Sequence, residues 1–352
     1  MKIKILLVLF IFFVSALFSG ATNVRVRKTR SAKSTRTATA DPSEKLLEVV
    51  KLQILLERAH FSPGEIDGQI GANVRKALSA FQQSRNLPVS GKADDATLEA
   101  LGAGDLESPV TSYTITDQDA AGPFVHEIPQ DPMEQAKLDR MNFTSIQEEL
   151  GEKFHSSPWL LTQLNPQADF HAGAQIQVPN IESAGETQTA AGSAAIVKRD
   201  PKAVPVKNAD NSRQDSGATI VVRAKTSDVM LQDGDGQILF YAPATVGSEH
   251  DPLPEGNWKV TVIRKNPTFY YKPDLFWDSE PGDTDTKIAP GPNNPVGLVW
   301  IGVNAPHYGL HGSPEPGTIG HSESHGCIRM TNWDALMLAS LVKAGTPVTF
   351  EQ

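Results

Sequence analysis

The sequence predicts a multidomain protein of the α+β class. One observation is length, because a chain of 352 residues usually divides into two or three domains. Another is a change of pattern: apolar residues recur at helical spacing before residue 104, whereas residues 217–351 consist of short β-type runs punctuated by Gly and Pro. We therefore expect a small three-helix module, then an α/β module, then a mainly β domain of the sandwich or barrel type.

The first 21 residues have the pattern of a secretion signal. Lys2 and Lys4 precede an apolar run at 5–18, and the small residues at 19–21 suit a cleavage site. No later apolar run is long enough to span a bilayer, so we expect export to the periplasm or cell wall without a membrane span. Residues 22–41 are basic and predict a disordered tether, with contact to an anionic wall or lipid as the alternative.

The formal net charge of −9 argues against nucleic acid as a partner.

Residues 42–104 are expected to form the three helices. Asp41 followed by Pro42 is a helix-start signal, and helices are predicted up to a break at 61–64, then over 73–86 and 93–101. The Asp67-Gly68 pair, the segments 77–82 and 87–91, and the Thr97-Leu98 pair together resemble the three-helix peptidoglycan-binding module. A generic three-helix bundle is the alternative.

Residues 110–180 are expected to form the α/β module. A strand at 113–115 is followed by helices at 145–154 and 158–164, an Asn-Pro stop at 165–166, and a strand at 174–180. This order resembles a diverged LysM domain, which implies glycan binding; a spacer that binds nothing is the alternative. Residues 181–216 are rich in Ala, Gly and Ser and predict a flexible linker. We therefore expect the reaction of the last domain not to need the earlier modules.

The domain at 217–351 is expected to be mainly β. Strands are predicted at 219–223, 228–231, 237–241, 258–262 and 297–301, and the one clear helix is at 332–342. Asp233 to Gly236 reads as a hairpin turn. A calcium-binding loop is the alternative at these residues, but the acidic ligands that such a loop needs further along the chain are missing. The long Gly- and Pro-rich connection at 266–294 carries several aromatic residues, and we expect it to form a lid or to pack into the core.

Cys327 is the only cysteine in the sequence. Exported proteins usually pair their cysteines, so a lone one is an inert core residue, half of an intermolecular bridge, or a working thiol. The flanking Ser-His-Gly run at 324–326 favours a nucleophile, because a reactive thiol needs a base and close backbone approach. Four histidines are candidate bases: His307, His311, His321 and His325.

Spacing discriminates between these histidines. His311 follows the strand expected at 297–301 and should lie on a strand facing the Cys327 segment. On an extended stretch, His325 would share a face with Cys327. Gly326 would leave room for a substrate carbonyl, whose oxyanion backbone N–H groups could stabilise. A zinc site at the two i,i+4 histidine pairs plus Cys327 is the rival, but the surrounding Gly and Pro argue against the helices it needs, so no metal is expected.

The His-Gly pair at 311–312 and the Ser-His-Gly-Cys-Ile-Arg run at 324–329 resemble the signature of the L,D-transpeptidase catalytic domain, or YkuD domain. Segments at 243–247, 254–258, 289–297 and 308–312 extend the resemblance in order across the last domain. The resemblance implies the roles of individual residues. They are the nucleophile Cys327, the base His311 oriented by the Gly312 carbonyl, His325, Gly326 and Ser324 around the oxyanion, and donor contacts from Arg329 and Tyr308.

The resemblance also implies a reaction and partners. Cys327 would attack a peptidoglycan stem peptide before its terminal D-alanine, and an amine of a neighbouring stem would take the thioester. Stem peptides and glycan would be the partners, carbapenems would acylate Cys327, and no cofactor is implied. An L,D-carboxypeptidase or wall hydrolase on the same scaffold, or a catalytically silent wall-binding protein, are the alternatives.

Overall fold

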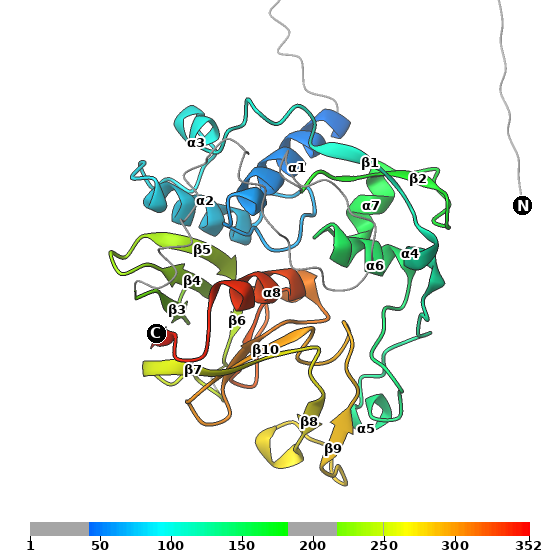
Figure 1. The fold of residues 1–352 in the computed structure, drawn as a ribbon, viewed down its shortest axis with the longest axis vertical. Coiled ribbons are helices and arrows are strands. Elements are labelled where there is room, and N and C mark those ends of the chain that lie inside the picture. The colour runs from blue at the N-terminus through cyan, green and yellow to red at the C-terminus, as the bar shows by residue number, and fades with distance from the viewer. Residues whose placement is uncertain (1–41, 182–216, 249) are drawn as a thin grey trace, which may run out of the picture. The chain divides into compact units, whose positions relative to one another are not determined.

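The computed structural model describes residues 42–181, 217–248 and 250–352. The leader expected at 1–21, the tether expected at 22–41 and nearly all of the linker expected at 181–216 lie outside the described residues. Within these residues, no helix combines the length and the apolarity that crossing a bilayer requires. The predicted class is confirmed, because helices and strands are mixed and helical, α/β and mainly β regions follow one another along the chain (Figure 1).

The helical module is organised around one buried amide. It consists of α1 (Pro42–Arg58), α2 (Ala72–Ser84) and α3 (Asp95–Ala100). Gln82 on α2 is fully buried, and its side-chain oxygen accepts hydrogen bonds from the N–H groups of Ser90 and Gly91. Its amide nitrogen donates to Thr97 Oγ1 on α3 at 2.9 Å. The turn predicted at 89–91 and the last helix are therefore held to α2 by a single side chain.

The α/β module is a two-stranded antiparallel sheet covered by helices. Strands β1 (Val110–Thr114) and β2 (Gln175–Pro179) pair along their whole length. The helices are α4 (Asp117–Ala121), α5 (Pro132–Gln135), α6 (Ile146–Lys153) and α7 (Pro158–Leu164). Leu150, Phe154 and Leu161 pack against Ile176 and Val178 of β2. The strand-helix-helix-strand order predicted from the sequence is present, with α4 and α5 as additions between β1 and α6.

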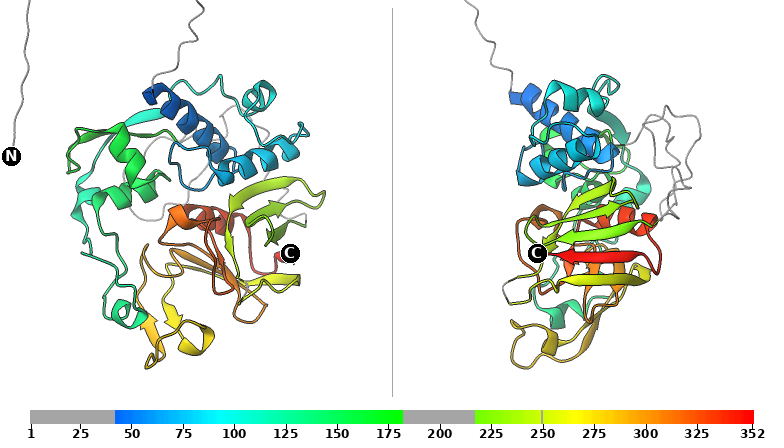
Figure 2. Two further views of the ribbon diagram at one scale, coloured as in Figure 1. Left: turned by 180° about the vertical axis from the view of Figure 1, so that it is seen from behind. Right: turned by 90° about the vertical axis from the view of Figure 1, so that its left-hand side faces the viewer.

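The mainly β domain is built on one nine-stranded sheet of order β5-β4-β3-β13-β7-β10-β11-β12-β6 (Figures 1 and 2). Its core contains residues from nearly all of these strands together with Ala335, Leu338 and Ala339 of α8 (Asn332–Leu341). A separate two-stranded sheet joins β8 (Phe269–Tyr271) to β9 (Thr286–Ile288). The nine strands are β3 (Thr219–Arg223), β4 (Asp228–Gln232), β5 (Ile238–Pro243), β6 (Thr245–Val246), β7 (Gly256–Lys265), β10 (Val299–Val303), β11 (Gly309–His311), β12 (Ile328–Arg329) and β13 (Pro347–Glu351).

The helical module is docked on the outer face of this sheet. Ile220 and Phe240 face the core of the β domain, whereas the alternate residues Val221, Met230 and Tyr241 are buried against Phe61, Phe81 and other side chains of the helical module. Tyr241 and Ser62 also exchange backbone contacts across this boundary, because the Ser62 N–H donates to the Tyr241 carbonyl at 2.9 Å. The helical module and the mainly β domain therefore share a hydrophobic core, although the α/β module and the linker expected at 181–216 separate them in the sequence.

We expect Phe61→Ala to destabilise the mainly β domain as well as the helical module. Phe61 is 2% exposed and meets Phe81 edge to face at 5.4 Å between ring centroids. Loss of such a ring costs about 3 to 5 kcal/mol of unfolding free energy. Urea unfolding followed by tryptophan fluorescence measures the effect, because all five tryptophans lie outside the helical module.

Val89→Ala is the matched control for this substitution. Val89 belongs to the same module but is 60% exposed, so its removal should leave the fluorescence transition unchanged. A tryptophan transition that Phe61→Ala leaves in place would mean that the shared core does not couple the two regions.

Candidate active site

Strand register places His311 and Arg329 on one face of the sheet and brings the Cys327 segment next to them. The parallel strands β11 and β12 pair Leu310 with Ile328 and His311 with Arg329. Leu310 and Ile328 are fully buried in the core of the β domain, so the neighbouring residues point to the opposite face. Cys327 comes directly before β12, and the Arg329 guanidinium acts electrostatically on both Cys327 and His311. The guanidinium is therefore a common neighbour of the thiol and the imidazole.

The ring of His311 is fixed on both sides. It is 3% exposed, and its Nδ1 lies 2.6 Å from the Gly312 carbonyl oxygen. Because that oxygen can only accept, Nδ1 carries the proton and Nε2 keeps its lone pair. The indole of Trp300 on β10 stacks on the imidazole with centroids 5.5 Å apart. His311 is thus held in the tautomer that a general base needs.

Gly309 and Gly312 leave room for these contacts. A Cβ on Gly309 would collide with the Trp300 ring, and a Cβ on Gly312 would collide with Asn332 Oδ1. Asn332 is itself fixed, since that oxygen accepts from the Leu298 N–H at 2.9 Å. The close packing of Asn332 behind Gly312 therefore positions the carbonyl that orients His311.

The thiol and the imidazole are both neutral near pH 7. Burial lowers the pKa of His311 to about 4, because the charged ring would lose hydration that the Gly312 hydrogen bond only partly replaces. Burial raises the pKa of Cys327 to about 11, although a backbone hydrogen bond from Gly309 and the charge of Arg329 oppose the rise. The pair is therefore not a preformed thiolate and imidazolium, and the thiol must lose its proton during attack.

Arg329 is a free cation beside this pair. Its pKa is lowered by burial, and it makes no hydrogen bond or ion pair with any residue that the structure describes. Within the described ranges, the Cys327 thiol has only backbone partners, the Gly309 backbone and the His307 carbonyl oxygen, the latter at 3.7 Å. The guanidinium is therefore available for an anionic group of a ligand that approaches Cys327.

The segment before Cys327 is a bend stabilised by Ser324. The buried Ser324 hydroxyl donates to the Cys327 carbonyl oxygen at 2.7 Å. Gly326 has φ +94°, and a Cβ there would press on the ring of Tyr308 at 3.2 Å. Tyr308 is anchored in turn, because its hydroxyl donates to the Pro252 carbonyl. Within the described chain, the N–H groups of Gly326 and Cys327 find no acceptor, so both are free to bind an oxyanion.

His325 lies elsewhere than expected. The extended stretch that would have put His325 and Cys327 on one face is absent, because the backbone bends at 325–327. His325 Nε2 lies 2.9 Å from Asp278 Oδ1, and the His325 ring contacts Phe276 and Trp277 at centroid distances of 5.2 and 5.4 Å. These three partners belong to the connection at 266–294, which carries β8 and β9. His325 thus joins that connection to the bend before Cys327.

The other two histidines are less well placed. His307 and His321 are both exposed, and neither lies on a helix. The i,i+4 geometry on which the zinc alternative depends is therefore missing at both histidine pairs. Across the described ranges, no three His, Cys, Asp or Glu side chains are grouped to hold a metal ion.

The sequence identified the chain segments that meet at this site but missed two supporting residues. Trp300 and Asn332 contact His311 and Gly312 from other elements, and no local spacing links them to the Cys327 segment. For Trp300, the only signal was its place on the strand expected at 297–301. Its contact with His311 follows from the β10 register, which pairs these two residues.

Two family models match the chain. A model described as the L,D-transpeptidase catalytic domain, YkuD, matches residues 217–350. A model described as a candidate peptidoglycan-binding domain matches residues 46–101. Both matches fall on regions whose elements are described above.

Among relatives, a Bacillus subtilis (strain 168) protein named as a candidate L,D-transpeptidase, YkuD, is 46% identical over 201 residues, covering 56% of this chain and 89% of that protein. A Bacillus licheniformis protein of the same name is 48% identical over 60 residues, covering 17% of this chain and 36% of that protein. A solved L,D-transpeptidase from Mycobacterium smegmatis has a TM-score of 0.32 and 19% identity, covering 39% of this chain and 59% of that one. This chain belongs to the L,D-transpeptidase family.

Proposed function

We propose that this protein is an exported L,D-transpeptidase that cross-links peptidoglycan through a thioester on Cys327, with His311 as general base. The observation that carries the proposal is the pairing of β11 with β12, which brings the chain segment of Cys327 next to His311, whose Nδ1 is hydrogen-bonded to the Gly312 carbonyl. The family membership supports the same reading. A cell-wall or periplasmic location fits the leader-like first residues and the peptidoglycan-binding module.

The first half of the reaction is acylation. Cys327 Sγ attacks the carbonyl carbon between the third residue of a donor stem and its terminal D-alanine, and the thiol proton passes to His311 Nε2. The carbonyl oxygen becomes an oxyanion, which the N–H groups of Gly326 and Cys327 stabilise. The C–N bond then breaks, and D-alanine leaves as an amine after taking the proton from His311. The donor remains as a thioester on Cys327.

The second half transfers the acyl group. The side-chain amine of an acceptor stem attacks the thioester carbon and loses a proton to His311. The C–S bond breaks, and the thiolate of Cys327 takes that proton back. Each positioned proton transfer contributes about two to four orders of magnitude in rate. The product is a cross-link between the third residues of two stems.

Three groups are available to hold the donor. Arg329 supplies the unpaired cation on the reactive face and suits the carboxylate of the terminal D-alanine. Tyr308 forms the wall behind Gly326. The connection at 266–294 brings Phe276 and Trp277 to the same bend, and Trp277 is 60% exposed. We propose that this connection is a lid that covers the donor stem and excludes water, which favours an amine acceptor over hydrolysis.

Product analysis tests the proposal. Purified protein should convert disaccharide-tetrapeptides into dimers linked between third residues, with release of D-alanine, and mass spectrometry identifies both products. Tripeptide monomers without dimers would make the protein a carboxypeptidase instead. A chelator should leave the yield of dimers unchanged, and loss of activity that added zinc restores would contradict the thiol mechanism.

A further inference from the structure

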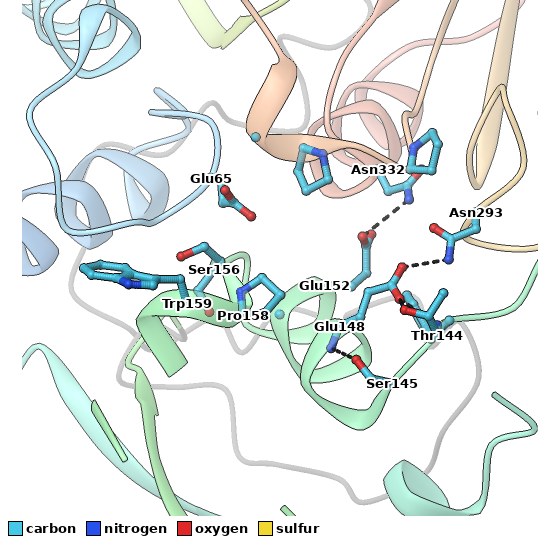
Figure 3. A pocket seen from close by; sticks show the side chains of 16 residues that line it. Glu65, Thr144, Ser145, Glu148, Glu152, Ser156, Pro158, Trp159, Asn293 and Asn332 are labelled. Atoms are coloured by element: carbon cyan, nitrogen blue, oxygen red, sulfur yellow. Dashed lines mark hydrogen bonds between the residues drawn. The ribbon is translucent and has the colours of Figure 1, made fainter. Parts of the chain in front are cut away.

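A cavity of about 440 Å³, whose lining residues do not include Cys327 or His311, lies where three regions of the chain meet (Figure 3). Glu65 comes from the helical module, α6 and the start of α7 from the α/β module, and Asn293 and Asn332 from the mainly β domain. Its walls are fixed to one another by backbone hydrogen bonds. Ile66 N–H donates to the His155 carbonyl at 2.9 Å, and Asn293 N–H donates to the Met141 carbonyl at 2.9 Å.

The cavity wall is acidic and contains no basic side chain. Of its 16 lining residues, three are glutamates and none is Lys, Arg or His. Glu148 is already engaged, because its carboxylate accepts from the Thr144 N–H at 2.6 Å and from the Asn293 amide at 2.7 Å. The remaining two, Glu65 and Glu152, therefore determine which class of ligand the cavity binds.

These two carboxyls have acceptor capacity to spare. Glu65 has no hydrogen-bond partner among the residues that the structure describes, and Glu152 accepts only one long hydrogen bond, at 3.4 Å from Asn332. Burial raises the pKa of Glu65 to about 7 and that of Glu152 to about 8. Near neutral pH, without a positive partner, both groups are therefore substantially protonated.

A third group in the wall also lacks a partner. Ser156 is 1% exposed, yet its hydroxyl makes no hydrogen bond within the described chain. A buried hydroxyl without a partner is costly, so its presence in a cavity wall points to a polar ligand. Beside it stands Trp159, whose side chain is 52% exposed although large apolar groups usually avoid water. Figure 3 shows Glu65, Ser156 and Trp159 around one end of the cavity and Glu152 beside Asn332.

The ligand that fits these groups is an organic ammonium. Two free carboxyls without a counter-ion favour a cation, and the described residues offer no grouping compact enough for a metal ion. An indole face accepts an ammonium or the methylene chain that carries it. We propose that this cavity binds the amine-bearing side chain of a wall stem peptide, holding a second strand of substrate at a site that does not include Cys327. The choice of a stem peptide rests on the proposed function; the preference for an ammonium does not.

Calorimetry on the full-length chain carrying Cys327→Ala tests the assignment without turnover. The probe is the tripeptide L-alanyl-γ-D-glutamyl-L-lysine, whose side-chain ammonium has no carboxylate beside it, and the control ligand is the same tripeptide with its side-chain amine acetylated. The free amine should bind at least about tenfold more tightly than the acetylated form. Titration in buffers of different ionisation enthalpy should detect proton release, because the bound ammonium ionises the two carboxyls.

Variants locate the binding. Glu65→Gln and Glu152→Gln should each weaken binding about tenfold or more and reduce proton release, and Trp159→Ala should weaken it too. Glu149→Gln is the matched control, because Glu149 lies on α6 but does not line the cavity. Equal affinity for the two tripeptides, or affinity that Glu65→Gln and Glu152→Gln leave unchanged, would overturn the proposal. Binding of N-acetylglucosamine oligomers that Trp159→Ala abolishes, without tripeptide binding, would also overturn it.

The test of the cavity can fail or succeed independently of the test of the transpeptidase reaction. With Cys327 intact, Glu65→Gln and Trp159→Ala should keep their rate of acylation by a carbapenem, since neither residue belongs to the site around Cys327. Failure to form cross-links together with normal tripeptide binding would remove the transpeptidase activity but leave the cavity assignment standing.

Discussion

Cys327→Ala should abolish both cross-link formation and covalent labelling by a carbapenem while leaving the fold unchanged. The chain has no second thiol that could replace it. The side chain is small and contacts only backbone groups of His307 and Gly309, so its removal should shift the thermal midpoint little. Intact-mass spectrometry of the wild-type protein should show one adduct per chain, and peptide mapping should place it on Cys327.

Cys327→Ser is the sharper variant, because it keeps a nucleophilic atom and changes its acidity. A hydroxyl is far harder to deprotonate by a neutral imidazole than a thiol is. We therefore expect no adduct within the time in which the wild-type protein is fully acylated. An adduct on another residue, or cross-linking that survives in correctly folded Cys327→Ala, would remove this thiol from the mechanism.

His311→Ala should slow acylation by about two to four orders of magnitude, whereas His321→Ala should change it less than about twofold. His311 is buried with its Nε2 free to accept a proton, but His321 is exposed on a loop. The measurement is the rate of carbapenem acylation under single-turnover conditions. Equal losses in the two variants would show that the base is wrongly assigned.

The pH profile separates a base from a structural residue. The pKa of His311 is lowered to about 4, so the imidazole is a neutral base above that value, and the thiol stays protonated up to its pKa of about 11. The wild-type acylation rate should therefore be nearly constant between these limits and fall below about pH 4. In His311→Ala only the rare thiolate reacts, so the rate should rise about tenfold per pH unit up to about pH 11. A flat profile in the variant would contradict general-base catalysis by His311.

The elements of the fold could be predicted because local pattern determines them. The β3 bounds match the predicted 219–223, and α7 begins at Pro158 after a Ser cap and ends before Asn165, as expected. Strands β6, β11 and β12 are only two or three residues long, too short for period-2 alternation to appear. Their position depends on neighbours that lie far away in the sequence.

The docking of the helical module illustrates a signal that was present but not used. Ile220, Val221 and Val222 form an uninterrupted apolar run, and such a run indicates a strand buried on both faces. The composition of the segment at 181–216 instead suggested a linker, and hence that the reaction of the last domain would not need the earlier modules. The composition of the linker says nothing about whether the domains it joins pack together. The apolar residues on the outer face of the sheet do, because they indicate that another part of the protein covers that face.

The candidate site divides in the same way. The sequence singled out Cys327, His311 and Gly326 because these residue types, in these short motifs, are typical of a cysteine nucleophile, its base and a close backbone approach. Asn332 and Trp300 act through contacts set by strand register and helix position, which a single sequence does not reveal. His325 was misplaced because Gly326, with φ +94°, turns a stretch that was expected to be extended.

The position of β13 has a consequence for how the enzyme is assembled. This strand follows the other eight strands of the sheet in the chain, yet it lies between β3 and β7 and pairs with both. Without it the sheet is two separate pieces, one carrying the surface that receives the helical module and the other carrying Cys327 and His311. A nascent chain that still lacks residues 347–351 therefore lacks the strand that pairs with both pieces. Completion of the nine-stranded sheet thus waits for the last strand of the chain to be synthesised.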